Sequence, residues 1–355
     1  MNQTNTGELS IQNVQQLYDD EELDDFEDED DMLQSNQSLV NGSENDLNLG
    51  PRHLVPRKLL IYSDNLRDFE PQRLYIRSLR GPIEDMEIAL RDTLNLSLMA
   101  SASFRFDPAL NLLEITDTRF PRWTAIQTSH SKVRVEAKLY ILASGYDVED
   151  CPYSYIMRQA LSALERQLGI RRVDLLILSF SGINMVQVEE NEESATDFSR
   201  FLDNIMGIWS QGERYIHYGR IVDLGVANFS PWQMELLYKK VKVRPAMNHI
   251  RFQDDTQVIP PQVLEHAEKN GYGLSLHEDR MDPLTDIMFA EMNRDFLVNQ
   301  KFPTIEIPSE GSVVDIMFPR WAMSYIVTNN ETEVIESRGY IAMISSDNGR
   351  DPDQI

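Results

Sequence analysis

The sequence predicts an α/β fold built as a closed (β/α)8 barrel. Short apolar runs typical of strands alternate with amphipathic stretches of helical length, which is the pattern of βα units and a parallel sheet. The run Val173–Phe180 is apolar almost throughout, as expected of a strand buried on both faces. Roughly eight such units in about 300 residues favour a closed barrel over an open sheet.

The first predicted elements are a strand at 58–63 and a helix at 81–99. The helix has Pro82 in its first turn, where the missing N–H has no helical partner, and its apolar residues recur at helical spacing. The stretch 92–131 has the weakest pattern, so the first three units are expected to be compressed or irregular.

After residue 131 the alternation is regular. In the second predicted helix, Ile156, Ala160 and Leu164 share one face. The last helix of this series begins at a proline and is followed by Gly271, a residue that favours the backbone conformation of helix ends. Strands are expected at 133–143, 173–180, 221–226, 245–250 and 272–276, and helices at 152–168, 195–209, 230–240 and 261–270.

The composition excludes several classes of protein. The chain has 355 residues with 33 Lys and Arg against 58 Asp and Glu, a net charge of −25, so it lacks the basic surface that nucleic acids and anionic membranes require. Its single cysteine, Cys151, excludes an intrachain disulfide and a thiolate-rich zinc site. We read Cys151 as an ordinary residue at a helix start, with pairing to another chain as the alternative. No secretory signal is visible, and we expect a cytoplasmic protein.

The charge is concentrated at the N-terminus. Residues 1–50 contain 14 Asp and Glu and no Lys or Arg, so they carry −14 of the net charge of −25. Such a segment buries too little apolar surface to offset its ordering entropy. We therefore expect a disordered acidic tail at 1–50 and a barrel at 51–355. The alternative is a partner-binding acidic motif that uses Leu23 and Phe26.

Several motifs resemble the aldo-keto reductase superfamily. Gly219–Phe229 (GRIVDLGVANF) is similar to the strand that ends in GVSNF in those proteins, and Val243–Ile250 (VRPAMNHI) is similar to their KPAxNQ strand. Arg320-Trp321-Ala322 is similar to the RWA that opens their last helix region. The resemblance implies a TIM barrel of aldo-keto reductase type.

Within that superfamily the chain most resembles the regulatory (modifier) subunits of glutamate–cysteine ligase. Three motifs of these subunits carry the resemblance. Their VSAKLFI strand is matched by Val135–Ile141 (VEAKLYI), their helix start at two prolines by Pro260-Pro261, and their SKGYI segment by Ser337–Ile341 (SRGYI). Together the motifs cover most of residues 58–345, and the acidic tail lies outside them.

The catalytic residues of a reductase of this superfamily are incomplete here. Carbonyl reduction requires a tyrosine as proton donor, a lysine that lowers its pKa, an aspartate that holds the lysine and a histidine that orients the carbonyl. Lys138 matches the lysine, but Ser179 stands at the histidine position. Asp107 is the only candidate for the aspartate, and Leu112 occupies the tyrosine position. Tyr140 shares a strand face with Lys138, one layer away. These positions are read as vestigial, with Lys138 paired to an acidic residue at the barrel mouth or binding an anionic ligand or partner.

A cofactor and a metal are not predicted. The two nicotinamide-binding positions correspond to Asn228 and His249, and the phosphate clamp reads Ile335–Arg338, where Glu336 opposes a 2′-phosphate and Arg338 is the remaining cation. Residual NADPH binding stays open. His277-Glu278-Asp279 is predicted to be a polar network at the mouth rather than a metal site.

The resemblance implies a non-catalytic regulatory subunit that binds the catalytic subunit of glutamate–cysteine ligase, raises its activity and relieves feedback inhibition by glutathione. Animal members have adjacent cysteines where this chain has Gln253–Thr256, so a covalent heterodimer is not predicted. Arg338, Gly339 and Tyr340, with the helix 261–270, are expected to contribute to the interface. The alternatives are an NADPH-dependent reductase and an NADPH-binding barrel without turnover.

Overall fold

A computed structural model describes residues 56–63, 65–66, 85–97, 102–107, 109–117, 132–142, 153–180, 191–251, 259–277, 279, 283–284 and 318–345. All of them belong to one compact unit, His53–Ile355. The acidic tail predicted at 1–50, Cys151 and Gln253–Thr256 lie outside the described residues. The division into a tail and a barrel therefore stays a prediction.

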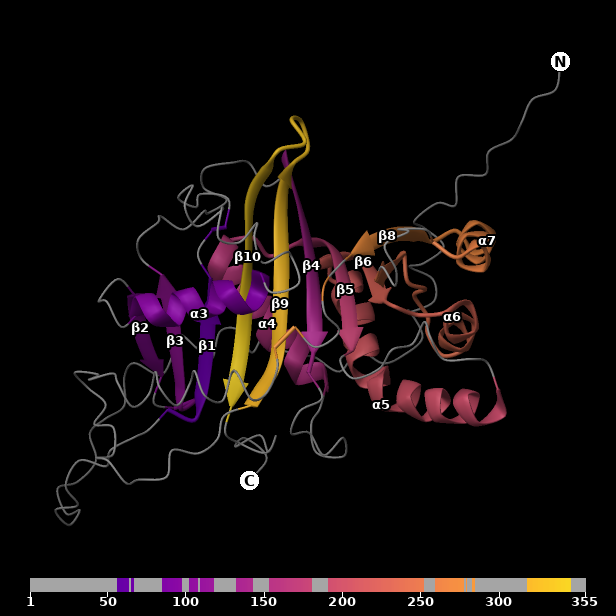
Figure 1. Ribbon diagram of the computed structural model, residues 1–355, viewed down its shortest axis with the longest axis horizontal. Coiled ribbons are helices and arrows are strands. Elements are labelled where there is room, and N and C mark those ends of the chain that lie inside the picture. The colour runs from indigo at the N-terminus through magenta and orange to yellow at the C-terminus, as the bar shows by residue number, and fades with distance from the viewer. Residues whose placement is uncertain are drawn as a thin grey trace, which may run out of the picture. The chain divides into compact units, whose positions relative to one another are not determined.

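The described strands form one ten-stranded sheet in the order β2-β3-β1-β10-β9-β4-β5-β6-β7-β8 (Figure 1). Its edges are β2 and β8, and within the described part of the chain no strand pairing joins these edges. The strands are β1 (Lys58–Tyr62), β2 (Ala102–Asp107), β3 (Leu112–Asp117), β4 (Val133–Ile141), β5 (Val173–Phe180), β6 (Ile221–Ala227), β7 (Met247–Arg251), β8 (Gly273–His277), β9 (Phe318–Asn329) and β10 (Ile335–Ser345).

The half of the sheet from β4 to β8 follows the predicted alternation. Each of these strands is parallel to the next along the chain. The connecting helices are α4 (Tyr153–Leu168), α5 (Glu192–His217), α6 (Pro231–Tyr238) and α7 (Pro261–Asn270). Helix α7 ends as expected at Gly271, which has a φ of 74°. The α/β class is confirmed, and this half of the sheet is compatible with a barrel of the TIM type.

The centre of the sheet departs from a simple βα repeat. Strands β9 and β10 form an antiparallel hairpin that inserts between β1 and β4 (Figure 1). The resemblance implied a helix region from Arg320-Trp321-Ala322, and that expectation is wrong because this segment lies in β9. Residues 319–323 are all buried, as in a central strand covered on both faces, and alternation begins at Met323, after which Tyr325 and Val327 are buried and Ile326 is exposed.

The weak stretch 92–131 contains a second hairpin. Helix α3 (Asp85–Ser97) precedes β2 and β3, which pair antiparallel, and β3 then runs parallel to β1. The expected irregularity of the first units is therefore a short helix and a hairpin rather than three compressed βα units.

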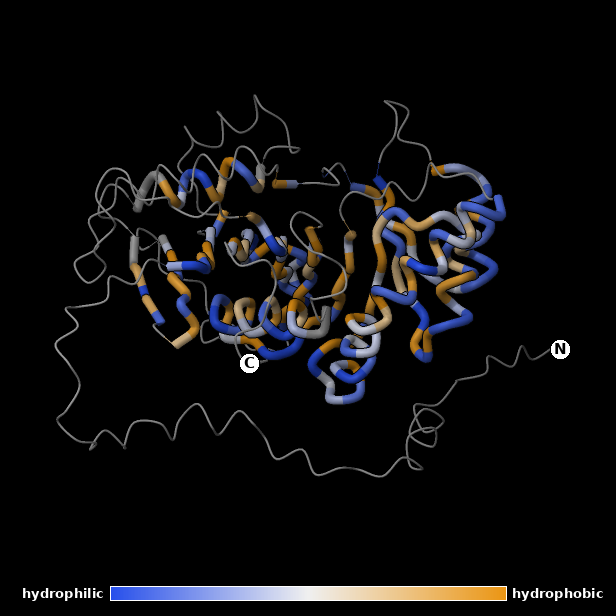
Figure 2. Tube along the Cα trace, turned by 90° about the horizontal axis from the view of Figure 1, so that it is seen from below, coloured by the Kyte–Doolittle hydropathy of each residue, from blue (hydrophilic) through white to orange (hydrophobic). Residues whose placement is uncertain are grey.

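Helices pack on both faces of the sheet. Along the helices and strands hydrophobic and hydrophilic residues alternate (Figure 2), so each element has an apolar face to bury. Met86, Leu90 and Leu94 of α3 pack in one cluster with Leu59 and Ile61 of β1. Residues of α4 and α5 pack in a larger cluster on the opposite face; these include Ile156, Ala160, Leu202, Ile205 and Trp209. Among the described residues no helix is long and apolar enough to cross a membrane.

Candidate functional site

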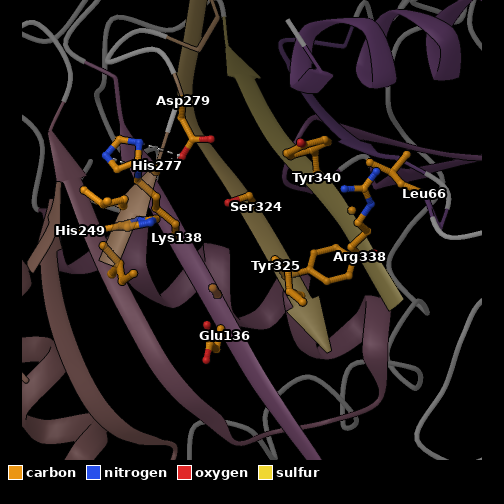
Figure 3. Close-up of a pocket in the computed structure, with 15 residues that line it drawn as sticks. Leu66, Glu136, Lys138, His249, His277, Asp279, Ser324, Tyr325, Arg338 and Tyr340 are labelled. Carbon is orange, nitrogen blue, oxygen red and sulfur yellow. Dashed lines mark hydrogen bonds and ion pairs between the residues drawn. The ribbon is translucent and has the colours of Figure 1, made fainter. Parts of the chain in front are cut away.

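A cavity of about 450 Å³ lies over the strands β4, β9 and β10, on the face that α3 covers further along. The strand register defines its floor. Lys138 of β4 lies opposite Ser324 of β9, which lies opposite Tyr340 of β10. Arg338 lies two residues before Tyr340 on β10. It lies opposite Ile326 of β9, which is two residues after Ser324. Figure 3 shows Arg338 and Tyr340 at one side of this cavity, with Ser324 between them and Lys138.

Lys138 is the buried cation of the cavity. Its side chain is 5% exposed, and its Nζ donates to Asp279 Oδ2 at 2.9 Å and lies 3.3 Å from His277 Nδ1. Burial lowers the pKa of Lys138, whereas the charge of Asp279 opposes this shift. The expectation that Lys138 is paired with an acidic residue agrees with this geometry, which identifies the residue as Asp279.

Asp279 joins a second strand residue to this ion pair. The phenol of Tyr140 donates to Asp279 Oδ2 at 2.7 Å. Burial raises the pKa of Tyr140 well above its ordinary value, and the negative charge of Asp279 raises it further. A tyrosine that serves as a general acid needs a pKa closer to neutrality, so the environment of Tyr140 favours a structural role.

Two histidines complete the polar group. The rings of His249 and His277 lie 4.3 Å apart, and His277 Nδ1 is 3.3 Å from Asp279 Oδ2. Burial lowers the pKa of both imidazoles, and for His249 it falls to about 3. Both rings are therefore neutral at pH 7. His277 and Asp279 form the polar network predicted from His277-Glu278-Asp279, and no metal-binding cluster occurs among the described residues.

The structure does not bring the other vestigial catalytic positions to Lys138. Ser179 lies opposite Tyr140 in the register of β5 and β4 and is buried outside the cavity lining. Asp107 lies at the end of β2, where its Oδ1 accepts hydrogen bonds from the N–H groups of Ala109 and Leu110. Along the sheet, β2 lies five strands from β4, and Asp107 does not line the cavity.

Of the predicted cofactor positions, some line the cavity and others do not. Asn228, which has a φ of 64°, accepts a hydrogen bond from the N–H of Arg251 at 2.7 Å and so fastens β6 to β7. It does not line the cavity, whereas His249 and Arg338 do. The segment Ile335–Arg338 lies inside β10 rather than after the last strand. The two predicted nicotinamide residues are neighbours, since the N–H of Asn228 donates to the carbonyl of His249 at 3.0 Å, but only His249 lines the cavity.

The predicted interface residues of β10 differ in accessibility. Gly339 is buried, and a Cβ atom there would lie 2.5 Å from Tyr325 Oη and 2.9 Å from Ser63 Oγ. Arg338 and Tyr340 are half-buried and line the cavity. Sequence reasoning missed Ser324 and Ile326, which lie on the cavity face in the part of β9 where burial alternates, Met323–Val327.

The buried His249 predicts a pH dependence of stability. Its pKa of about 3 in the folded chain lies below the value near 6.5 expected after unfolding, so the unfolded state takes up the proton first. The contribution to stability is complete above pH 6.5 and decreases as the pH falls toward 3. Between pH 7 and pH 5 we expect the native chain to lose about 1–2 kcal/mol more than His249→Phe in urea unfolding. Equal losses in the two proteins would contradict the lowered pKa.

The chain is similar to curated proteins described as glutamate–cysteine ligase regulatory subunits. It is 24% identical over 210 residues to the mouse and human proteins and 23% identical to that of cattle, and these matches cover 59% of this chain. The chain spans 65% of the length of each of these relatives, just under two thirds. These matches confirm the resemblance seen in the motifs. No family model matches the chain.

Some solved structures of aldo-keto reductases can be superposed on part of this chain. A silkworm aldo-keto reductase complexed with NADPH is 19% identical and overlaps 36% of each chain, with a TM-score of 0.27. An aldo/keto reductase from Klebsiella pneumoniae in complex with NADP and acetate is 15% identical, overlaps 39% of this chain and 40% of its own, and has a TM-score of 0.26.

Proposed function

We propose that this chain is a non-catalytic regulatory subunit of glutamate–cysteine ligase. In this role it binds the catalytic subunit, raises its activity and relieves feedback inhibition by glutathione, in the cytoplasm. The observation that carries the proposal is the similarity to regulatory subunits from three mammals. Because regulation of this kind is a coupling free energy, the heterodimer must favour one conformation of the catalytic chain.

The geometry around Lys138 supports a role without turnover. The ammonium group is engaged by Asp279, and the neighbouring phenol of Tyr140 donates to the same carboxylate. A proton donor for a carbonyl would need a lowered pKa, and that of Tyr140 is raised. These contacts neutralise charge inside the cavity and do not prepare a hydride-transfer site, so we favour the regulatory role over the reductase alternative.

The test is the activity of the cognate catalytic subunit with and without this chain, across a series of glutathione concentrations. We expect a higher rate and a higher concentration of glutathione for half-inhibition, together with a complex on size-exclusion chromatography. Unchanged rates and no complex would contradict the proposal. NADPH consumption with aldehydes, abolished in Lys138→Met, would favour the reductase.

The outer face of α7 is the more accessible of the two predicted interface regions. Leu264 on this helix is 42% exposed, whereas Val263 and Ala267 are buried. A single exposed leucine is ordinary on a protein surface, so the assignment of α7 to the interface rests on the resemblance. We propose that α7 contacts the catalytic subunit, with Arg338 and Tyr340 reached through the mouth of the cavity.

Leu264→Glu should therefore weaken binding of the catalytic subunit by about tenfold, since truncated interface anchors cost more than about 1 kcal/mol. Titration calorimetry or biolayer interferometry measures this affinity. The matched control is Leu110→Glu, because Leu110 is 43% exposed at the turn between β2 and β3. An equal affinity for both variants would remove α7 from the interface.

A further inference from the structure

The cavity has one cation that the described carboxylates leave uncompensated. Lys138 is paired with Asp279, and Glu136, which also lines the cavity, is paired with Arg134 at 2.8 Å. Arg338 lines the cavity, and no described carboxylate forms an ion pair with its guanidinium. The charge of Arg251 also reaches this region, since it contributes to the lowered pKa of Lys138. The four charged side chains of the lining, Glu136, Lys138, Asp279 and Arg338, sum to zero, and Arg338 is the cation among them that no described carboxylate engages.

The remaining lining defines the other properties of a ligand. Leu66, Ile177, Leu276 and Ile326 supply apolar surface, and Ser324 supplies a hydroxyl on the floor. The Nδ1 atom of His249 is buried and has no hydrogen-bond partner among the described residues. A volume of about 450 Å³ lies within the range of small-molecule sites, which bury an apolar body and orient it through a few polar groups.

We propose that this cavity binds a small organic acid with one carboxylate and an apolar body. The planar guanidinium of Arg338 would bind the carboxylate through two parallel hydrogen bonds. The apolar body would lie across Ser324 and Ile326 toward Lys138, whose Cα is about 12 Å from that of Arg338 if strand spacing and rise are regular. One cation without an ion-pair partner matches one negative charge, so a monocarboxylate is favoured over a phosphate dianion. This inference goes beyond the proposed regulatory function and does not depend on it.

The experiment measures binding of three probes to the isolated full chain by titration calorimetry, with ligand-observed NMR as a second readout. The probes are 3-phenylpropionate, its uncharged amide and phenyl phosphate. We expect 3-phenylpropionate to bind in the millimolar range or tighter, and the other two to bind at least about tenfold more weakly. An amide that binds equally well, a preference for phenyl phosphate, or no binding of any probe would overturn the proposal.

Variants locate the binding site. Arg338→Gln should weaken 3-phenylpropionate binding by about tenfold or more, and Arg338→Lys should recover only part of this loss, because lysine keeps the charge without the planar fork. The matched control is Arg200→Gln, which removes the same charge from an exposed position on α5. Ser324→Leu fills the floor of the cavity without changing its charge and should also reduce binding. Unchanged binding in both Arg338→Gln and Ser324→Leu, each folded by circular dichroism, would place any binding elsewhere.

NADPH serves as a further probe because it distinguishes an organic acid site from a dinucleotide site. If NADPH competes with 3-phenylpropionate and binds more tightly, the cavity is a nucleotide site and the monocarboxylate proposal is overturned. Failure of the regulatory function would be visible only in the ligase assay with the catalytic subunit, so the two proposals fail independently.

Discussion

Gly339→Ala is expected to destabilise the protein by about 3 kcal/mol, because overpacking of a core costs about 1–3 kcal/mol and occasionally more. Gly339 of β10 lies directly opposite Tyr325 of β9, and the tyrosine ring covers the space where a side chain would stand. A Cβ atom there would be 2.5 Å from Tyr325 Oη and 2.8 Å from its Cζ. Tyr325 is 2% exposed and its hydroxyl accepts a hydrogen bond from Gln167, so it has little room to move.

The matched control for this substitution is Gly207→Ala. Gly207 lies inside α5, and a Cβ atom there would meet nothing within 4 Å. Alanine should therefore stabilise the helix by about 0.5–1 kcal/mol, since glycine is the poorer helix former. Urea unfolding of the two variants measures both effects. If Gly339→Ala were as stable as the native chain, Tyr325 would not be fixed over β10, and the SRGYI motif would lose this explanation.

Asp279→Asn is expected to cost about 2–3 kcal/mol of folding free energy. Removing one partner of a buried ion pair leaves an uncompensated charge, which typically costs about 3–5 kcal/mol. The lower figure applies here because Asp279 is itself 39% exposed, although Lys138 is only 5% exposed. Lys138→Met should cost less, because the partly exposed Asp279 keeps access to water. The midpoint of urea unfolding at pH 7 measures both.

The double variant Asp279→Asn, Lys138→Met tests whether the two residues act through each other. We expect it to be more stable than the sum of the single changes implies, by about 1–2 kcal/mol, as residues in direct contact generally are coupled. Asp203→Asn removes the acid of the exposed ion pair with Lys240 and should change stability by less than about 1 kcal/mol. Additive effects at Asp279 and Lys138 would contradict the ion pair.

The parts of the fold that could be predicted are those in which local pattern and tertiary role agree. The strand at 173–180 is apolar because both of its faces are buried, and α7 begins and ends at residues with strong conformational preferences, Pro261 and Gly271. The central hairpin was not predicted, because Arg320-Trp321-Ala322 resembles a helix start and residues 319–323 are all buried, so the alternation typical of a strand begins only at Met323.

The candidate site was predicted only where the chemistry is local. The polar network at His277 and Asp279 follows from residues adjacent in sequence. Its contact with Lys138 does not, because β8 lies four strands from β4 in the sheet, and yet His277 of β8 lies 3.3 Å from Lys138 Nζ. The same holds for Arg338, whose position beside Ser324 and Ile326 depends on the register of β9 and β10.

The insertion of β10 beside β1 has a consequence for synthesis of the protein on the ribosome. The hydroxyl of Ser63 accepts a hydrogen bond from the N–H of Tyr340, and 277 positions separate these residues. At translation rates of about 5–20 residues per second, β1 emerges roughly 15–55 s before its neighbour exists. During this time its apolar face and one of its edges are available to chaperones or to other nascent chains. A message that ends before codon 345 should therefore yield an aggregation-prone product rather than a shorter functional subunit.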